Sequence, residues 1–286
     1  MKDKMERFFY NPVSKEYEFK LRSDLFESDL KYINENKIDN ILLTTETYKW
    51  SSIEALLEIQ NLRTLHLGIG AVELTNLYKL NGIKVLSIGE ECFNVNLEGL
   101  ESLEKLYISY RKGLKGLNSL INLEDLEFRE CRDKKFDWKN EFSGLKKLKH
   151  LELTLCALPA TFGFLDQNKN LETLEIHYCR SEFSIKILST LPNLSKLILA
   201  QCPNIKDIEN VEMLQSLKWL RITDAGVIKD CSFISKMKNL EVLIVNGKSY
   251  FENGDLSSAI GKLKHFGFDN KKHYSHKEED FPSVFR

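Results

Sequence analysis

A short pattern of apolar residues that returns at a nearly fixed interval constrains the fold of this chain more than any other feature. In the copies that begin at Leu148, Leu171 and Leu194, apolar residues stand at the first, fourth and sixth places and a cysteine stands at the ninth. From Ile38 to Leu263 the pattern can be laid down eleven times, at intervals of 20 to 25 residues. Such a period is typical of repeat arrays, in which each unit buries its apolar face against its neighbours.

The places are numbered here from the first apolar residue of each copy. The copies begin at Ile38, Leu62, Ile83, Leu103, Leu123, Leu148, Leu171, Leu194, Leu217, Leu240 and Leu263. The fourth, fifth and sixth places alternate in polarity, so we expect Leu151 and Leu153 to point inward from a strand and Glu152 to point outward. Between copies, apolar residues recur every third residue, which suits one or two turns of helix or 3₁₀-helix.

The pattern resembles L-x-x-L-x-L-x-x-(N/C)-x-L, the repeat of the leucine-rich repeat family. The resemblance covers most of the chain and implies an α/β fold class. The expected architecture is a right-handed leucine-rich repeat solenoid, or horseshoe. It would have a parallel β-sheet on its concave face and short helical or 3₁₀ segments on its convex face.

Cysteine occupies the ninth place in four successive copies, at Cys131, Cys156, Cys179 and Cys202. In the family this place holds a small side chain that turns inward and bonds the backbone of the turn after the strand. The resemblance therefore implies that the four cysteines form a structural ladder. A ladder spaces its members about 4.8 Å apart along a line, whereas a metal site needs ligands that converge on one point. No metal is predicted there.

The sequence divides into three segments. Residues 1–37 are expected to form an N-terminal cap of a hairpin and a helix, because Phe8 to Leu21 alternate around a turn and the residues after Ser23 follow helical spacing. Residues 38–271 hold the array of about eleven repeats, and residues 272–286 are polar and are expected to form a C-terminal tail.

Composition narrows the function classes. The chain has 286 residues, 29% of them charged, and a formal net charge of −1, so nothing in the total charge calls for nucleic acid or an anionic membrane as a partner. No stretch approaches the roughly 20 apolar residues that span a bilayer, and the start contains no apolar run typical of a signal peptide. We therefore expect a cytoplasmic protein. Its six cysteines are too few for a disulfide framework in a chain of this length.

The outward side chains of neighbouring repeats are the candidate binding surface. Glutamate occupies the fifth place in three successive copies, and like charges on adjacent strands repel unless cations or solvent relieve them. An acidic surface edged by tyrosines suits a basic protein. The predicted binding residues are Tyr107, Tyr110, Glu127, Glu152, Glu175, His177, Tyr178, Trp219 and Arg221. The alternative is that these residues are only the solvated side of a sheet, neutralised in part by nearby cations.

Catalysis and metal binding find little support. A metal site formed by Glu152, Glu175 and His177 can be drawn, but no spacing beyond strand stacking favours it. No serine, histidine and aspartate set is brought together by the repeat geometry, and the flanks are too short for a separate catalytic domain. The sequence predicts no enzyme activity, no cofactor and no metal.

The predicted function is a non-enzymatic protein-binding module that holds a partner with a basic surface against its concave sheet. Two alternatives remain open. One is an immunity-type inhibitor that covers the active site of a basic toxin, and the other is an adaptor or regulatory subunit of an enzyme complex. The sequence identifies neither the partner nor the oligomeric state.

Overall fold

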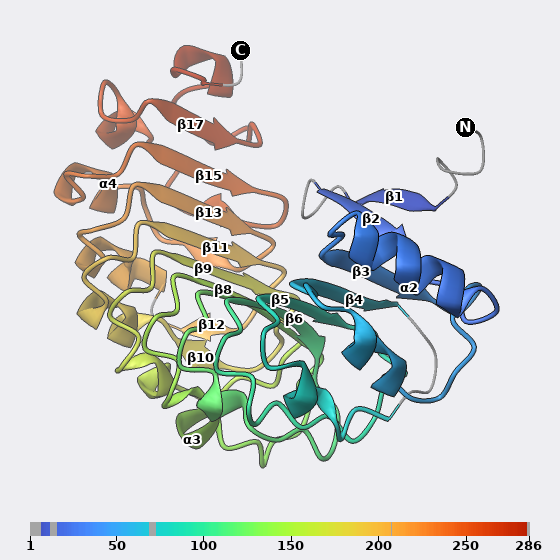
Figure 1. Cartoon of the computed structure of the whole chain (residues 1–286). Helices are drawn as coiled ribbons and strands as arrows, with labels where there is room; N and C mark the ends of the chain where they lie inside the picture. The colour runs from blue at the N-terminus through green and yellow to red at the C-terminus, as the bar shows by residue number, and fades with distance from the viewer. Residues whose placement is uncertain (1–6, 12–15, 69–72, 207, 285–286) are drawn as a thin grey trace. The chain divides into compact units, whose positions relative to one another are not determined.

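A computed structural model describes residues 7–11, 16–68, 73–206 and 208–284 of the chain. The chain forms two compact units, Met1–Leu126 and Glu127–Arg286. Their strands and short helices are labelled in Figure 1.

The first unit begins with an antiparallel pair of strands followed by a helix and by parallel strands. Its elements are β1 (Phe8–Asn11), β2 (Glu16–Lys20), α2 (Phe26–Glu35), β3 (Asn40–Thr44), η1 (Glu54–Glu58), β4 (Thr64–Gly68), η2 (Leu77–Leu80), β5 (Val85–Ile88), β6 (Lys105–Ser109) and η3 (Leu117–Ser119). Strands β1 and β2 pair with Phe8 opposite Phe19. Strands β2, β3, β4, β5 and β6 then pair in parallel, in chain order.

The second unit continues the alternation of strands and short helical turns. Strand β7 (Asp125–Arg129) contains the boundary between the units. The following elements are α3 (Trp138–Phe142), β8 (His150–Thr154), η4 (Gly163–Leu165), β9 (Thr173–His177), β10 (Phe183–Ser184), η5 (Lys186–Thr190), β11 (Lys196–Ala200), β12 (Ile205–Lys206), η6 (Ile208–Met213), β13 (Trp219–Thr223), β14 (Val227–Ile228), α4 (Phe233–Lys236), β15 (Val242–Asn246), β16 (Tyr250–Phe251), η7 (Ser257–Ala259), β17 (His265–Phe268) and η8 (Glu278–Asp280).

The repeat pattern sets the register of the main sheet in this unit. Strands β8, β9, β11, β13, β15 and β17 pair in parallel, and equivalent places of successive repeats lie side by side, as Leu151 does with Leu174. Leu151 and Leu153 are fully buried and Glu152 between them is partly exposed. The expected inward and outward alternation is confirmed.

The helical segments are short and lie on one side of this sheet, as Figure 1 shows for α3 and α4. The interval between copies leaves room for a turn or two, and the turns close by bonds over three residues, such as Leu188 N–H to the Ile185 carbonyl at 3.0 Å. The longest interval holds α3, whose first residue, Trp138, is buried. The Asp137 carboxylate caps α3 by accepting a 3.1 Å hydrogen bond from the Asn140 N–H. The expected α/β repeat architecture is therefore present.

All six cysteines lie among the described residues and are buried free thiols. In the ladder, the thiols of Cys179 and Cys202 lie 3.4 and 3.3 Å from the carbonyls of His177 and Ala200, to which they donate. Burial raises the pKa of Cys156 to about 12. A thiol of this kind stays protonated at neutral pH and packs as a small apolar group.

Residues after β17 fold back onto the last repeat. Phe281 is buried, with its ring centroid 5.0 Å from that of Phe266 and 5.7 Å from that of Phe268. The Tyr274 hydroxyl accepts a 2.9 Å hydrogen bond from the Phe251 N–H. These aromatic contacts cover apolar surface that the last strand would otherwise expose.

Candidate functional site

In the second unit, the face of the main sheet opposite the short helices carries a continuous row of fifth-place side chains. We call it the open-face row. Its register follows directly from the strand pairing. Glu152 lies opposite Glu175, Glu175 opposite Ile198, Ile198 opposite Arg221, and Arg221 opposite Ile244. Two of the predicted glutamates are thus direct neighbours on adjacent strands, where their repulsion must be relieved.

Glu175 obtains that relief from three side chains, one on its own strand β9 and one on each of the neighbouring strands β8 and β11. Lys196 Nζ lies 2.8 Å from Glu175 Oε1, His177 Nε2 is hydrogen bonded to Oε2 at 3.3 Å, and His150 Nε2 lies 3.9 Å from Oε1. The hydrogen bond from His177, followed by the bond and charge of Lys196, lowers the pKa of Glu175 to about 2. Glu175 is therefore ionised throughout the neutral range.

Arg129 relieves the repulsion at the other two glutamates, Glu127 and Glu152. Its guanidinium forms an ion pair with Glu127 and lies 3.8 Å from Glu152. Glu152 also accepts a 2.9 Å hydrogen bond from the Thr154 hydroxyl. The three glutamate side chains are only 16 to 20% exposed.

The same cluster contains the group that could hold a metal ion. Ligand atoms of Glu152, Glu175 and His177 all lie within 4.8 Å of one another. However, Glu175 already binds the ammonium group of Lys196, and a metal ion would have to displace that cation. The arrangement is better described as an ion-pair network, and we assign no metal to it.

The other predicted residues of the second unit lie further along the sheet or at its edge. Arg221 is exposed and donates a hydrogen bond from Nε to the Thr223 hydroxyl at 3.1 Å. Trp219 is half-buried and lies between Lys196 and Val242 in the register. Tyr178 follows β9 and is 49% exposed.

Tyr107 and Tyr110 belong to the first unit and are both half-buried. Tyr107 lies opposite Ser87 of β5. The remaining seven predicted binding residues all lie in the second unit. The structure thus groups the acidic residues closely and assigns the tyrosine pair to the other compact unit.

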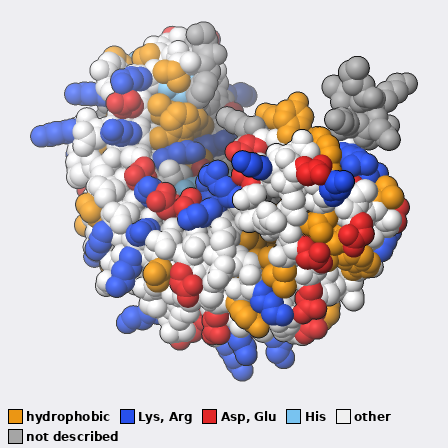
Figure 2. Space-filling view, in the orientation of Figure 1, with side chains coloured by type: hydrophobic (Ala, Val, Ile, Leu, Met, Phe, Trp, Pro, Cys, Tyr) orange, Lys and Arg blue, Asp and Glu red, His pale blue; other side chains and the backbone are white. Residues whose placement is uncertain are grey.

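Acidic and basic side chains alternate over the visible surface, with no broad area of a single charge, as Figure 2 shows. This distribution agrees with the formal net charge of −1. The acidic character of the site is therefore local, and its range in physiological salt is about 8 Å.

Comparison with known proteins gives similarity at the level of structure. No known family and no curated protein matches the sequence. An internalin (inlF) from Listeria monocytogenes str. 4b F2365 superposes with a TM-score of 0.50 at 15% identity, over 91% of this chain and 86% of that chain. An internalin C2 (inlC2) from the same strain gives a TM-score of 0.45 at 20% identity, over 69% of this chain and 83% of the other.

The parallel strands, the repeat register and the superposition on the first internalin all indicate the same repeat fold. The chain folds as a leucine-rich repeat protein. The repeat fold that the resemblance implied is thereby confirmed, together with the expected fold class. No helix among the described residues is long and apolar enough to cross a membrane.

In the leucine-rich repeats of the second unit, the eighth place adopts a left-handed backbone conformation that the sequence analysis did not anticipate. The residues with positive φ at this place are Glu130, Leu155, Tyr178, Gln201, Asp224 and Gly247. Each stands directly after a strand, and several extend its ladder, as Tyr178 does by donating from its N–H to the Ala200 carbonyl at 2.9 Å. The conformation turns the chain sharply, so the side chains at and after this place project beyond the strand ends.

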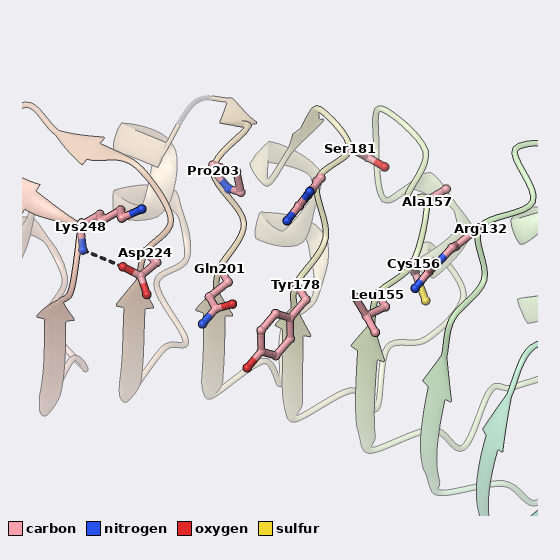
Figure 3. A pocket seen from close by; sticks show the side chains of 11 residues that line it. Arg132, Leu155, Cys156, Ala157, Tyr178, Ser181, Gln201, Pro203, Asp224 and Lys248 are labelled. Atoms are coloured by element: carbon pink, nitrogen blue, oxygen red, sulfur yellow. Dashed lines mark hydrogen bonds between the residues drawn. The ribbon is translucent and has the colours of Figure 1, made fainter. Parts of the chain in front are cut away.

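These side chains line a hollow of about 770 Å³ at the carboxyl ends of the strands, shown in Figure 3. It is lined by Arg132, Leu155, Cys156, Ala157, Tyr178, Arg180, Ser181, Gln201, Pro203, Asp224 and Lys248. Of these residues, only Tyr178 is among the binding residues predicted from the sequence. The recurrence of arginine at the tenth place, in Arg132 and Arg180, was the available signal.

Proposed function

We propose that this leucine-rich repeat protein is a non-enzymatic binding module. It holds another protein against the face of the main sheet in the second unit that carries the open-face row. The observation that carries the proposal is the open-face row, in which charged and apolar side chains from successive strands are held in fixed register. A preformed surface of this kind loses little conformational entropy on binding, which favours recognition of a folded partner.

The partner that fits this surface carries basic side chains. Glu127, Glu152 and Glu175 bring three partly buried carboxylates together on this surface, and Arg129 and Lys196 pair with them. A basic side chain of the partner can replace part of that internal pairing and donate charge-assisted hydrogen bonds to the same carboxylates. Trp219 and Arg221 extend the surface with the residue types that most often dominate binding energy.

The ion-pair network also determines how the binding should depend on charge and salt. Each glutamate is held by a neighbour, as Glu175 is by Lys196 at 2.8 Å, so the carboxylates are oriented before the partner arrives. Oriented charges contribute mainly to the association rate and to the choice of partner. We expect the affinity to decrease as salt increases, because the partly exposed carboxylates are screened.

The test compares two variants with equal change in net charge. One is Glu127→Gln/Glu152→Gln/Glu175→Gln. The control is Asp166→Asn/Glu209→Gln/Glu252→Gln, which alters exposed acidic residues outside the open-face row. Immobilised wild-type protein first captures partners from a lysate of the source organism, and each purified partner is then titrated against all three proteins at 50 and 300 mM salt.

We expect the open-face variant to weaken binding at least about tenfold at low salt, with a smaller difference at high salt, and the control to bind as the wild type does. Equal affinity of the open-face variant and the wild type for every captured partner would exclude the acidic row. Circular dichroism spectra of the three proteins must coincide for the comparison to hold.

A further inference from the structure

The hollow at the strand ends has a charge opposite to that of the open-face row. Arg132, Arg180 and Lys248 line it together with a single carboxylate, that of Asp224. Three cations and one anion give the lining a charge of +2, whereas the whole chain has a net charge of −1. A local excess of this sign favours an anionic ligand.

The three cations are available for a ligand. Within the described part of the chain, no ion pair or hydrogen bond engages the cationic groups of Arg132, Arg180 and Lys248, and all three residues are exposed. The one carboxylate is engaged elsewhere, because Asp224 Oδ1 accepts a 2.7 Å hydrogen bond from the Lys248 backbone N–H, the contact drawn in Figure 3. Asp224 therefore braces two successive repeats.

The hollow is elongated across the strands. In Figure 3, Leu155, Tyr178, Gln201 and Asp224 follow one another at the ends of successive strands. The lining runs from the repeat of Arg132 to the repeat of Lys248, which is five strand intervals or about 24 Å at 4.8 Å each. An extended peptide covers that length with about seven residues at about 3.3 Å per residue.

The positions of the cations also match a peptide. Arg132 and Arg180 occupy the tenth place of repeats two strands apart, a separation of about 10 Å. In an extended chain of the polyproline-II type, two carboxylates three residues apart lie on one side of the chain with nearly the same spacing, about 9 Å. Between the cations, the apolar parts of Leu155, Ala157 and Pro203 can contact uncharged side chains of the ligand.

A nucleic acid fits this place less well. Glu152 and Glu175 lie on the same strands, three residues before Leu155 and Tyr178, which corresponds to about 10 Å along the strand. A strand of phosphates has a uniform charge density and would meet this acidic cluster beside the hollow. A peptide can place its acidic residues in the hollow alone.

We infer that the hollow at the carboxyl ends of strands β7 to β15 binds an extended acidic peptide segment of about seven residues, with carboxylates held by Arg132, Arg180 and Lys248. Arginine binds a carboxylate through two parallel hydrogen bonds, which gives the interaction direction as well as charge. The site is separate from the open-face row, so a partner could carry basic side chains for one and an acidic segment for the other.

The experiment uses a phage-displayed library of random octapeptides as the probe and the full chain as the target. Enriched peptides are synthesised with a fluorescent label and titrated against the wild type by fluorescence anisotropy. The hollow variant is Arg132→Gln/Arg180→Gln/Lys248→Gln. The control is Lys146→Gln/Lys186→Gln/Lys262→Gln, which removes the same charge from exposed lysines that do not line the hollow.

The expected result is enrichment of peptides with at least two carboxylates two or three residues apart. Their dissociation constants should rise at least about tenfold in the hollow variant and less than about twofold in the control. The Glu127→Gln/Glu152→Gln/Glu175→Gln variant should still bind them, which keeps this test distinct from the test of the open-face row.

Four outcomes would overturn the inference. They are failure to enrich any peptide, enrichment of peptides without carboxylates, equal weakening in the hollow and control variants, and tighter binding of a labelled eight-nucleotide RNA than of the best peptide. Matching circular dichroism spectra and urea midpoints establish that each variant is folded.

Discussion

Arg22 holds the buried carboxylate of Asp29 at both oxygens, with Nε 3.2 Å from Oδ2 and Nη2 3.0 Å from Oδ1. The Arg22 backbone N–H also donates to Oδ2 at 3.2 Å, and Arg7 Nη1 lies 3.2 Å from Oδ1. Asp29 belongs to α2, whereas Arg7 directly precedes β1 and Arg22 lies two residues after the end of β2. The carboxylate therefore fastens the first helix to the start of the sheet in the first unit.

This relationship predicts a large effect from a small change. Asp29→Asn removes the charge while two arginines remain beside the amide, so we expect the free energy of unfolding of the first unit to fall by about 3 kcal/mol. Urea unfolding followed by tryptophan fluorescence measures it. Glu35→Gln, which removes a largely exposed pair with Lys31, should cost less than about 0.5 kcal/mol. Similar losses in the two variants would show that the buried carboxylate has no special role.

The pairing of Glu175 predicts an acid-dependent loss of stability in the second unit. Its pKa is about 2 in the folded state against an ordinary value of 4.5, so the ionised group stabilises the fold above about pH 4.5. This contribution decreases as pH falls from about 4.5 toward 2. The stability difference between the wild type and Glu175→Gln should therefore be smaller at pH 3 than at pH 6, by up to about 2 kcal/mol.

Urea unfolding of both proteins at several pH values measures this difference, with Glu209→Gln as the exposed control. A difference between wild type and Glu175→Gln that stays constant from pH 6 to pH 3 would contradict the assigned pairing. A difference that increases as the pH falls would reverse the sign of the expected linkage.

Two glycines offer a matched test of how the C-terminal residues are held. Gly254 has φ +70°, and a Cβ there would lie 2.4 Å from the His273 carbonyl oxygen. Gly261 has φ +67° with nothing within 4 Å of its Cβ position. Both alanine variants pay the left-handed backbone penalty of about 1 kcal/mol, but only Gly254→Ala must also push the backbone at residue 273 away.

We expect Gly254→Ala to be less stable than Gly261→Ala by at least about 1 kcal/mol, with faster proteolysis of residues 272–284. Urea unfolding and limited trypsin digestion measure the two effects. If the two variants unfold and are cleaved alike, the close approach of Gly254 to His273 does not hold the segment.

The sequence by itself determined the repeat architecture of this protein. Apolar side chains at the first, fourth and sixth places can be buried only if each repeat contributes one strand and stacks on the next, and this requirement predicted that Leu151 and Leu153 are inside and Glu152 is outside. The same pattern gave the row of glutamates, because a fixed period places equivalent residues side by side.

Only the tertiary structure decided what those glutamates contact. Lys196 reaches Glu175 from the next strand, and Arg129 lies between Glu127 and Glu152, since long side chains choose among several neighbours by their rotamers. The hollow could not be predicted from the sequence either, because it depends on the left-handed turn after each strand. That conformation occurs at Leu155 and Tyr178, and neither leucine nor tyrosine is a residue type that indicates it. Periodicity specifies which residues are neighbours, whereas side-chain geometry specifies which of them interact.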